Sequence, residues 1–192
     1  LFENGFTATG EERCIAEAEV IVICVPTPLT DDGVPDLERV ETACRAVSAN
    51  LQEDALVVLE STTYPGTTDG AVRENLEAES GLIAGDGFAL AYSPERIDPG
   101  NPVYGLRNTP KVVGGLTPSC TSRAVEFYSR IVDTVVATVG LREAEMAKLL
   151  ENTYRHVNIA LMNEMAVFCH ELGIDLWAAL EAGGDRPVGG GA

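Results

Sequence analysis

The sequence has 192 residues and a formal net charge of −17 at pH 7. Apolar residues make up 45% of it and charged residues 22%, which is typical of a folded globular protein. Because the negative charge repels phosphate groups, we expect neither nucleic acid nor an anionic membrane as a partner. No apolar run reaches the roughly 18 residues of a membrane helix, so we expect no membrane span. Eleven arginines accompany only two lysines, Lys111 and Lys148, so the place of each lysine is worth determining.

The five cysteines are scattered, odd in number and never closely paired. This spacing argues against a disulfide framework and against a zinc site, so we expect no metal. We expect buried, inert thiols in a reducing cytoplasm. The residues concerned are Cys14, Cys24, Cys44, Cys120 and Cys169.

The first half of the chain alternates segments of strand and helix pattern. Residues 20–25 (VIVICV) predict a parallel strand that is covered on both faces. A loop follows, and Asp36 is predicted to cap a helix that runs to about residue 51. Residues 55–59 and 88–92 predict two further buried strands, with a helix from Gly66 onward between them.

The second half begins with an irregular, proline-rich loop over residues 93–110. A short strand over residues 111–113, a helix over 118–131 and a strand over 134–139 are predicted to follow. Strands separated by helix-length segments indicate βαβ units and a parallel sheet. The sequence therefore predicts an α/β fold, in which residues 1–140 are part of a doubly wound, Rossmann-like nucleotide-binding domain.

From Arg142 the pattern changes to a single long helix. Residues 143–170 contain neither proline nor glycine, and their apolar residues have helical spacing, which predicts a helix of about 28 residues and about 42 Å. Gly173 ends this helix, and Asp175 begins a shorter one that extends to about residue 182. Such a helix can join two domains or form a dimer interface. We assign residues 141–183 to a central helical region and residues 184–192 to a truncated tail.

Polar residues follow three of the predicted strands. In a doubly wound sheet, ligands bind outside the carboxyl ends of the strands. Thr62 and Glu95 follow the strands over residues 55–59 and 88–92, where a cofactor or substrate would lie. Serine and threonine at such places can instead cap the following helices. The positions of Thr62 and Glu95 favour a functional role.

The long helix carries a second group of polar residues. Lys148, Asn152 and Arg155 have the spacing i, i+4 and i+7, so they project from one face. An ammonium, a carboxamide and a guanidinium in a row suit an oxyanion beside a phosphate or carboxylate. The alternative is a solvated stripe in which Lys148 pairs with Glu145 or Glu151. The spacing alone favours this alternative slightly.

Five motifs stand in a fixed order along the chain. They are residues 24–28 (CVPTP), 60–62 (EST), 92–101 (YSPERIDPGN), 111–115 (KVVGG) and 145–155 (EMAKLLENTYR). In this order they resemble the UDP-glucose/GDP-mannose dehydrogenase family over about residues 15–182. The segment SPERIDPGN most resembles the branch that acts on UDP-N-acetyl-hexosamines, especially the UDP-N-acetylglucosamine 6-dehydrogenases.

The resemblance implies an NAD-dependent enzyme that oxidises the C6 alcohol of a UDP-sugar to a uronic acid, through a cysteine thiohemiacetal and a thioester. Lys148 would steady the developing oxyanion or act in proton transfer, with Asn152 beside it. Glu95 would be the base for the hydrolytic water, and Thr62 would hold that water and approach the nicotinamide. A homodimer built by the long helix is also implied.

The resemblance also implies two sets of binding residues. Substrate-binding positions are matched by Arg96, Ile97, Lys148, Asn152 and Arg155. Positions near NAD are matched by Val25, Thr27, Ser61 and Thr62.

Two family features are not matched in this sequence. The glycine-rich phosphate turn would precede residue 1, and the catalytic cysteine would follow the region of residues 185–187 in a GPGxGGxC segment. None of the five cysteines matches that position, so we expect a fragment that is inactive alone. Two alternatives stay open: a β-hydroxyacid dehydrogenase type, which performs one oxidation without a cysteine, and a non-catalytic folded remnant.

Overall fold

The computed structural model describes residues 5–97 and 100–184. The chain divides into two compact units, one up to Leu149 and one from Leu150 onward, and each is described by itself. Most of the predicted tail, residues 185–192, lies outside the described residues.

The first unit is built on a five-stranded sheet whose spatial order equals its sequence order. Strands β1, β2 and β3 are parallel to one another, β4 is antiparallel to β3, and β5 is parallel to β4. The strands are β1 (Val20–Ile23), β2 (Leu56–Leu59), β3 (Ala89–Tyr92), β4 (Lys111–Gly115) and β5 (Val135–Ala137). The predicted α/β sheet is confirmed, and one of its four pairings departs from the parallel arrangement.

The antiparallel pairing of β3 and β4 was not predicted. Parallel neighbours need a long crossover, usually a helix, whereas antiparallel neighbours do not. The described residues between β3 and β4 contain no helix, which agrees with a chain that turns back. As a consequence Lys111, the first residue of β4, lies at the edge of the sheet where β1, β2 and β3 end.

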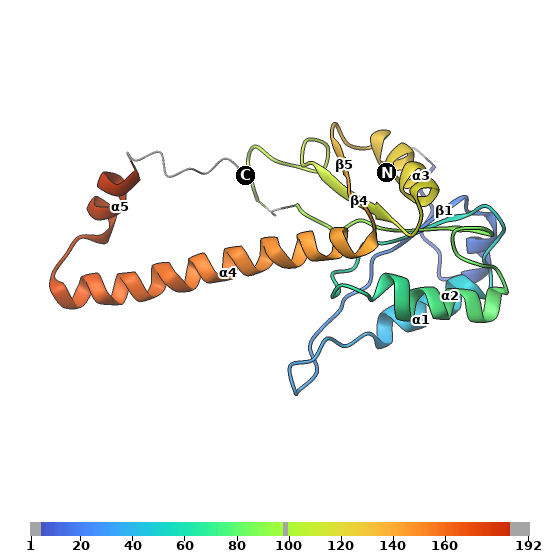
Figure 1. Cartoon of the computed structure of the whole chain (residues 1–192), viewed down its shortest axis with the longest axis horizontal. Helices are drawn as coiled ribbons and strands as arrows, with labels where there is room; N and C mark the ends of the chain where they lie inside the picture. The colour runs from blue at the N-terminus through green and yellow to red at the C-terminus, as the bar shows by residue number, and fades with distance from the viewer. Residues whose placement is uncertain (1–4, 98–99, 185–192) are drawn as a thin grey trace. The chain divides into compact units, whose positions relative to one another are not determined.

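Helices cover both faces of the sheet (Figure 1). Helices α1 (Glu38–Ser48) and α2 (Arg73–Ser80) pack on one face, and α3 (Pro118–Ser129) packs on the other. A six-residue 3-10 helix, η2 (Glu12–Glu17), precedes β1, and a π-helical segment, η3 (Thr68–Val72), leads into α2.

Two helix starts test the predicted caps. Helix α3 begins as expected, because the Thr117 side chain accepts a hydrogen bond from the Cys120 amide and proline stands in the first turn. Asp36, in contrast, is not the N-cap of α1, since that position is held by Leu37. The Asp36 carboxylate still accepts a hydrogen bond from the Glu38 amide at 2.9 Å, one residue further out than predicted.

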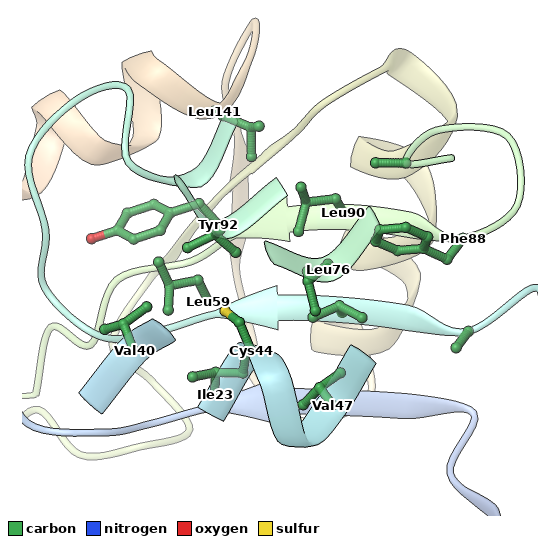
Figure 2. Close-up of a cluster of buried hydrophobic side chains, with 14 of the residues drawn as sticks. Ile23, Val40, Cys44, Val47, Leu59, Leu76, Phe88, Leu90, Tyr92 and Leu141 are labelled. Carbon is green, nitrogen blue, oxygen red and sulfur yellow. The ribbon is translucent and has the colours of Figure 1, made fainter. Parts of the chain in front are cut away.

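The core follows from the alternation of side chains along buried strands. Leu59 of β2 and Leu90 of β3 face α1 and α2, while Val58 and Ala91 face α3. Figure 2 shows the first of these clusters, in which side chains of α1 and α2 pack against Leu59, Leu90 and Tyr92 of the strands. Strand β1 differs from the prediction, because Val22 is 37% exposed and the strand is therefore not covered on both faces.

The cysteines are only partly as expected. Cys44 lies in the core between α1 and the sheet (Figure 2), and Cys120 and Cys169 are also buried. Cys14 and Cys24 are exposed, so the prediction of buried thiols is wrong for these two. Cys24 lies one residue beyond the end of β1, where the chain leaves the core.

Two adjacent glycines in β4 allow backbone segments to pack closely. A Cβ atom at Gly114 would lie 2.2 Å from the Gly140 carbonyl oxygen, and one at Gly115 would lie 2.2 Å from the Thr121 amide nitrogen. Both distances are too short for any side chain. The KVVGG motif thus has a packing requirement at its last two positions, independent of any ligand.

Helix α4 (Leu141–Leu172) begins in the first unit and extends through most of the second. Its 32 residues confirm the predicted long helix. Gly173 follows with φ of 68°, the left-handed conformation that ends many helices. Asp175 then caps α5 (Leu176–Gly184), because its carboxylate accepts hydrogen bonds from two amides of the first turn. Among the described helices, none has the length and apolar character to span a membrane.

Candidate active site

Hydrogen bonds connect the loops that follow β1 and β2. The buried Ser61 hydroxyl accepts a hydrogen bond from the Val25 amide at 2.9 Å and donates one to the Val25 carbonyl at 2.7 Å. The Thr27 hydroxyl donates to the Thr62 carbonyl at 2.7 Å. The structure therefore brings together all four residues that were predicted to lie near NAD, and their contact with NAD stays a prediction.

These bonds distinguish side chains that hold the backbone in place from a side chain that is exposed to a ligand. The side chains of Ser61 and Thr27 bind neighbouring backbone, so they shape the edge of the sheet. Thr62, between these bonds, is exposed at that edge. The loops after β1 and β2 are held together by these bonds and present an exposed hydroxyl. Dinucleotides bind at such strand ends in doubly wound sheets, so this edge suits one.

Glu95 lies just beyond β3, and the side chains of both lysines approach it. Its Oε1 accepts hydrogen bonds from the Arg96 and Ile97 amides at 2.7 and 2.6 Å. Its Oε2 lies 3.9 Å from Lys111 Nζ, and its carbonyl oxygen accepts a hydrogen bond from Lys148 Nζ. Two cationic side chains thus approach one residue from β4 and α4.

Arg96 and Ile97 continue the loop after Glu95, and both are half-buried. The Arg96 guanidinium donates a hydrogen bond to the Pro110 carbonyl at 2.8 Å. This contact joins the beginning of the loop to its end, directly before β4. The next two residues of the SPERIDPGN motif, Asp98 and Pro99, lie outside the described residues.

A buried polar cluster beside Glu95 was not anticipated from the sequence. Lys111 Nζ lies 3.0 Å from Glu60 Oε1, and the two side chains are only 9% and 14% exposed. The Tyr128 hydroxyl donates to the same oxygen of Glu60, and Lys111 Nζ lies 5.1 Å from the centre of the Tyr128 ring. Burial, followed by the charge of Glu60, raises the pKa of Tyr128, so its hydroxyl stays a hydrogen-bond donor. The available signal was the scarcity of lysine.

Cys24 contacts this cluster from the end of β1. Its thiol donates to Glu60 Oε2 at 3.7 Å. Loss of hydration, together with the charge of Glu60, raises the pKa of Cys24 to about 11. Because the thiolate is the nucleophilic form, Cys24 is poorly suited to nucleophilic catalysis at neutral pH.

Glu145 does not belong to a solvated stripe. It is fully buried, and its carboxylate accepts hydrogen bonds from the Gly66 amide at 2.7 Å, from the Thr68 amide at 2.9 Å and from the Thr68 hydroxyl at 2.7 Å. Burial raises the pKa of Glu145. These bonds attach the first turns of α4, and with them Lys148, to the segment that follows β2.

Asn152 and Arg155 belong to the second unit. Both lie on α4 as predicted, with Asn152 half-buried and Arg155 exposed. Their contacts with a substrate stay predictions.

Comparison with known proteins identifies the family of the chain. Residues 3–132 match the model of the NAD binding domain of the UDP-glucose/GDP-mannose dehydrogenase family, and residues 142–192 match the model of its central domain. The chain belongs to this family. Because residues 3–132 match the family's NAD binding domain, NAD is its cofactor.

Similar proteins include the protein CapL of Staphylococcus aureus, which is 40% identical over 94% of this chain and 42% of its own length. The UDP-N-acetyl-D-mannosamine dehydrogenase of Escherichia coli K12 is 36% identical over 89% of this chain and 42% of its own length. The solved UDP-D-ManNAc dehydrogenase of Pyrococcus horikoshii has a TM-score of 0.87 and 37% identity, over 94% of this chain and 43% of that one. The chain therefore spans about two fifths of the length of these relatives.

A pair of alanine variants separates the supporting residue from the exposed one. Ser61→Ala leaves the half-buried amide and carbonyl of Val25 without partners, which should cost about 1–3 kcal/mol of unfolding free energy. Thr62→Ala removes an exposed hydroxyl and should change that free energy by less than about 0.5 kcal/mol. Urea denaturation of the 192-residue chain, followed by circular dichroism, measures both. Equal effects of the two variants would contradict this assignment.

Proposed function

We propose that this chain forms the NAD-binding and central part of a cytoplasmic, NAD-dependent UDP-sugar 6-dehydrogenase. Its substrate would be a UDP-N-acetyl-hexosamine, and its product the corresponding uronic acid. The observation that carries the proposal is the convergence of Lys111 and Lys148 on Glu95, beside the strand end that holds Thr62. Family membership adds the cofactor.

The relatives narrow the substrate class without selecting one sugar. The SPERIDPGN segment resembles enzymes of UDP-N-acetylglucosamine, whereas two of the similar proteins are named for UDP-N-acetylmannosamine. Both sugars are UDP-N-acetyl-hexosamines that differ in configuration at C2. We retain both as candidates.

The proposed chemistry assigns a task to each side chain. When bound, NAD⁺ accepts the hydride that leaves C6. The Lys148 ammonium would stabilise negative charge on the C6 oxygen, since an alkoxide loses hydride more readily than an alcohol. Asn152, one helical turn further along α4, would donate a hydrogen bond to the same oxygen.

The second half of the proposed reaction hydrolyses a thioester on the family's cysteine, which none of the five cysteines of this chain matches. Glu95 would take a proton from the hydrolytic water, and the exposed Thr62 hydroxyl would hold that water. A base positioned at hydrogen-bond distance from water is the requirement for this step. Arg96, Ile97 and Arg155 would contact the nucleotide sugar away from C6.

Turnover of the full-length enzyme tests the proposal. We expect two NADH for each molecule of UDP-N-acetylglucosamine or UDP-N-acetylmannosamine oxidised, and much slower reaction with UDP-glucose. A single NADH for each sugar would favour the β-hydroxyacid dehydrogenase type instead. The 192-residue chain should give no steady NADH production, because it lacks the matching cysteine. Steady turnover by this chain would contradict its status as an inactive part, and an inactive full-length protein would favour a non-catalytic remnant.

Two variants of the full-length enzyme separate catalysis from substrate binding. Losing an electrostatic donor to an oxyanion typically costs about 3–4 kcal/mol, so Lys148→Ala should lower kcat about 100- to 1000-fold. Arg155→Ala should raise KM with kcat largely kept, because it would bind a part of the substrate that does not react. Steady-state kinetics measure both. A Lys148→Ala enzyme within a few-fold of the wild-type kcat would end the catalytic assignment.

We also propose that α4 forms a homodimer. Within the described part of the second unit, many large apolar side chains of α4 and α5 are exposed. They include Leu150, Tyr154, Val157, Leu161, Phe168 and Trp177. Exposed apolar surface costs about 25 cal/mol per Å², which favours burial against a second copy.

Sedimentation of the 192-residue chain at micromolar concentration tests the dimer. We expect a dimer for the unaltered chain and a monomer for Val157→Glu with Leu161→Glu, since two charges would have to be buried in the interface. Glu151→Gln serves as the control, because it changes a side chain of the same helix without adding a charge. A monomer for the unaltered chain would contradict the proposal.

A further inference from the structure

Lys111 is a buried cation beside the proposed base, and the family chemistry described above gives it no task. Its side chain is 9% exposed, whereas those of the two carboxylates that it contacts are 14% exposed for Glu60 and 49% exposed for Glu95. The cation therefore connects an inner carboxylate with an outer one. We propose that Lys111 is a positioning residue that fixes the Glu95 carboxylate for thioester hydrolysis, an inference that rests on the proposed function.

The inner side of the cluster holds the lysine in place. Glu60 Oε1 lies 3.0 Å from Lys111 Nζ and also accepts a hydrogen bond from the Tyr128 hydroxyl. The Tyr128 ring lies 5.1 Å from the ammonium, within the range of a cation–π contact. A buried ammonium needs such compensation, because removing a charge from water is costly unless it is paired and hydrogen-bonded. The ammonium is thus anchored from β2 and α3.

The outer contact leaves one carboxylate oxygen able to react. Glu95 Oε1 already accepts two hydrogen bonds from the amides of the next two residues. Glu95 Oε2 lies 3.9 Å from Lys111 Nζ, which is close enough for charge attraction and too long for a hydrogen bond. Lys111 can therefore orient Oε2 while that oxygen keeps its capacity to accept a hydrogen bond from water.

The step that depends on this orientation is the proposed hydrolysis. The water oxygen bonds to the thioester carbon, the carbon–sulfur bond breaks, and the cysteine leaves as a thiolate. Glu95 Oε2 takes the proton that the water loses. A displaced Oε2 would slow this step and leave the earlier oxidations intact, so the acyl-enzyme would accumulate.

The variants must remove the lysine without leaving a buried charge. Lys111→Met alone would strand the Glu60 carboxylate, so it is combined with Glu60→Gln, which keeps an oxygen for the Tyr128 hydroxyl. Arg73→Met is the matched control, because it removes a cation that pairs with Glu77 at 2.9 Å on α2. Thermal unfolding of each full-length variant shows whether it is folded.

In the folded double variant we expect kcat to fall about 10- to 100-fold, the scale of a misplaced catalytic group, while KM for the UDP-sugar changes less than about threefold. A rapid burst of NADH should precede slow turnover, and intact mass spectrometry should detect the acyl-enzyme. The same double substitution in a Glu95→Gln background should cause little further loss, because Lys111 acts through Glu95. Arg73→Met should keep the wild-type kcat.

Several outcomes would overturn the inference. One is a folded double variant with kcat near that of the wild type, and another is loss of the NADH burst itself. A third is a further fall in kcat, as large as in the wild type, when the double substitution is made in the Glu95→Gln background. A double variant that does not fold would also overturn it, since Lys111 would then be a stability element. An inactive wild-type enzyme would overturn the proposed function together with this inference, whereas an active wild type with an unaffected double variant would overturn this inference alone.

Discussion

The burial of β2 and β3 on both faces decides where polar chemistry can occur in the first unit. Every residue of these two strands is buried between the helical layers, so an unpaired polar side chain within them would carry a large desolvation cost. The first polar side chains beyond the strands that are not buried are those of Glu60 and Thr62 after β2 and of Glu95 after β3. Burial of the strands therefore concentrates the polar groups at one edge.

The charge at this edge differs from the average charge of the chain. The whole sequence carries −17, yet both of its lysines contact Glu95. The carboxylates of Glu60 and Glu95 balance these two ammonium charges, so this group of side chains is less acidic than the chain as a whole. Lys111 can reach the edge only because β4 runs antiparallel to β3. In a fully parallel sheet, the first residue of β4 would lie at the opposite edge.

The sequence predicted those elements whose cause is local. The apolar run of β2, the uninterrupted helical pattern of α4 and the capping residue Asp175 each act through neighbours a few residues away, and each was placed correctly. The direction of β4 depends on a loop without periodicity, so the pattern gave no indication of it. Contacts between distant segments were missed for the same reason: Lys111 and Glu60 are 51 positions apart in the sequence.

Local reasoning also failed where a run of apolar residues outlasted its strand. Residues 20–25 read as one buried strand, but β1 ends at Ile23 and Cys24 is exposed. A hydrophobic pattern indicates which side chains are suited to burial. Whether such a side chain is exposed depends on which helix covers it. Here α3 packs mainly on β3 and β4, so Val22 at the edge strand keeps an open face.

Each group that could react at this edge is held by a buried polar neighbour. Ser61, the neighbour of Thr62, holds the loop that follows β1. Glu145 attaches the part of α4 that carries Lys148 to the segment that follows β2. Lys111 has the corresponding place beside Glu95. Precise chemistry requires that reactive side chains be held by a second layer of packed and hydrogen-bonded residues, since a displacement of about 1 Å can cost about 100-fold in rate. Burial of the supporting residues makes this layer stiff. It also explains why the supporting residues were harder to find from the sequence: their partners are distant in the chain, whereas the exposed residues stand in recognisable motifs.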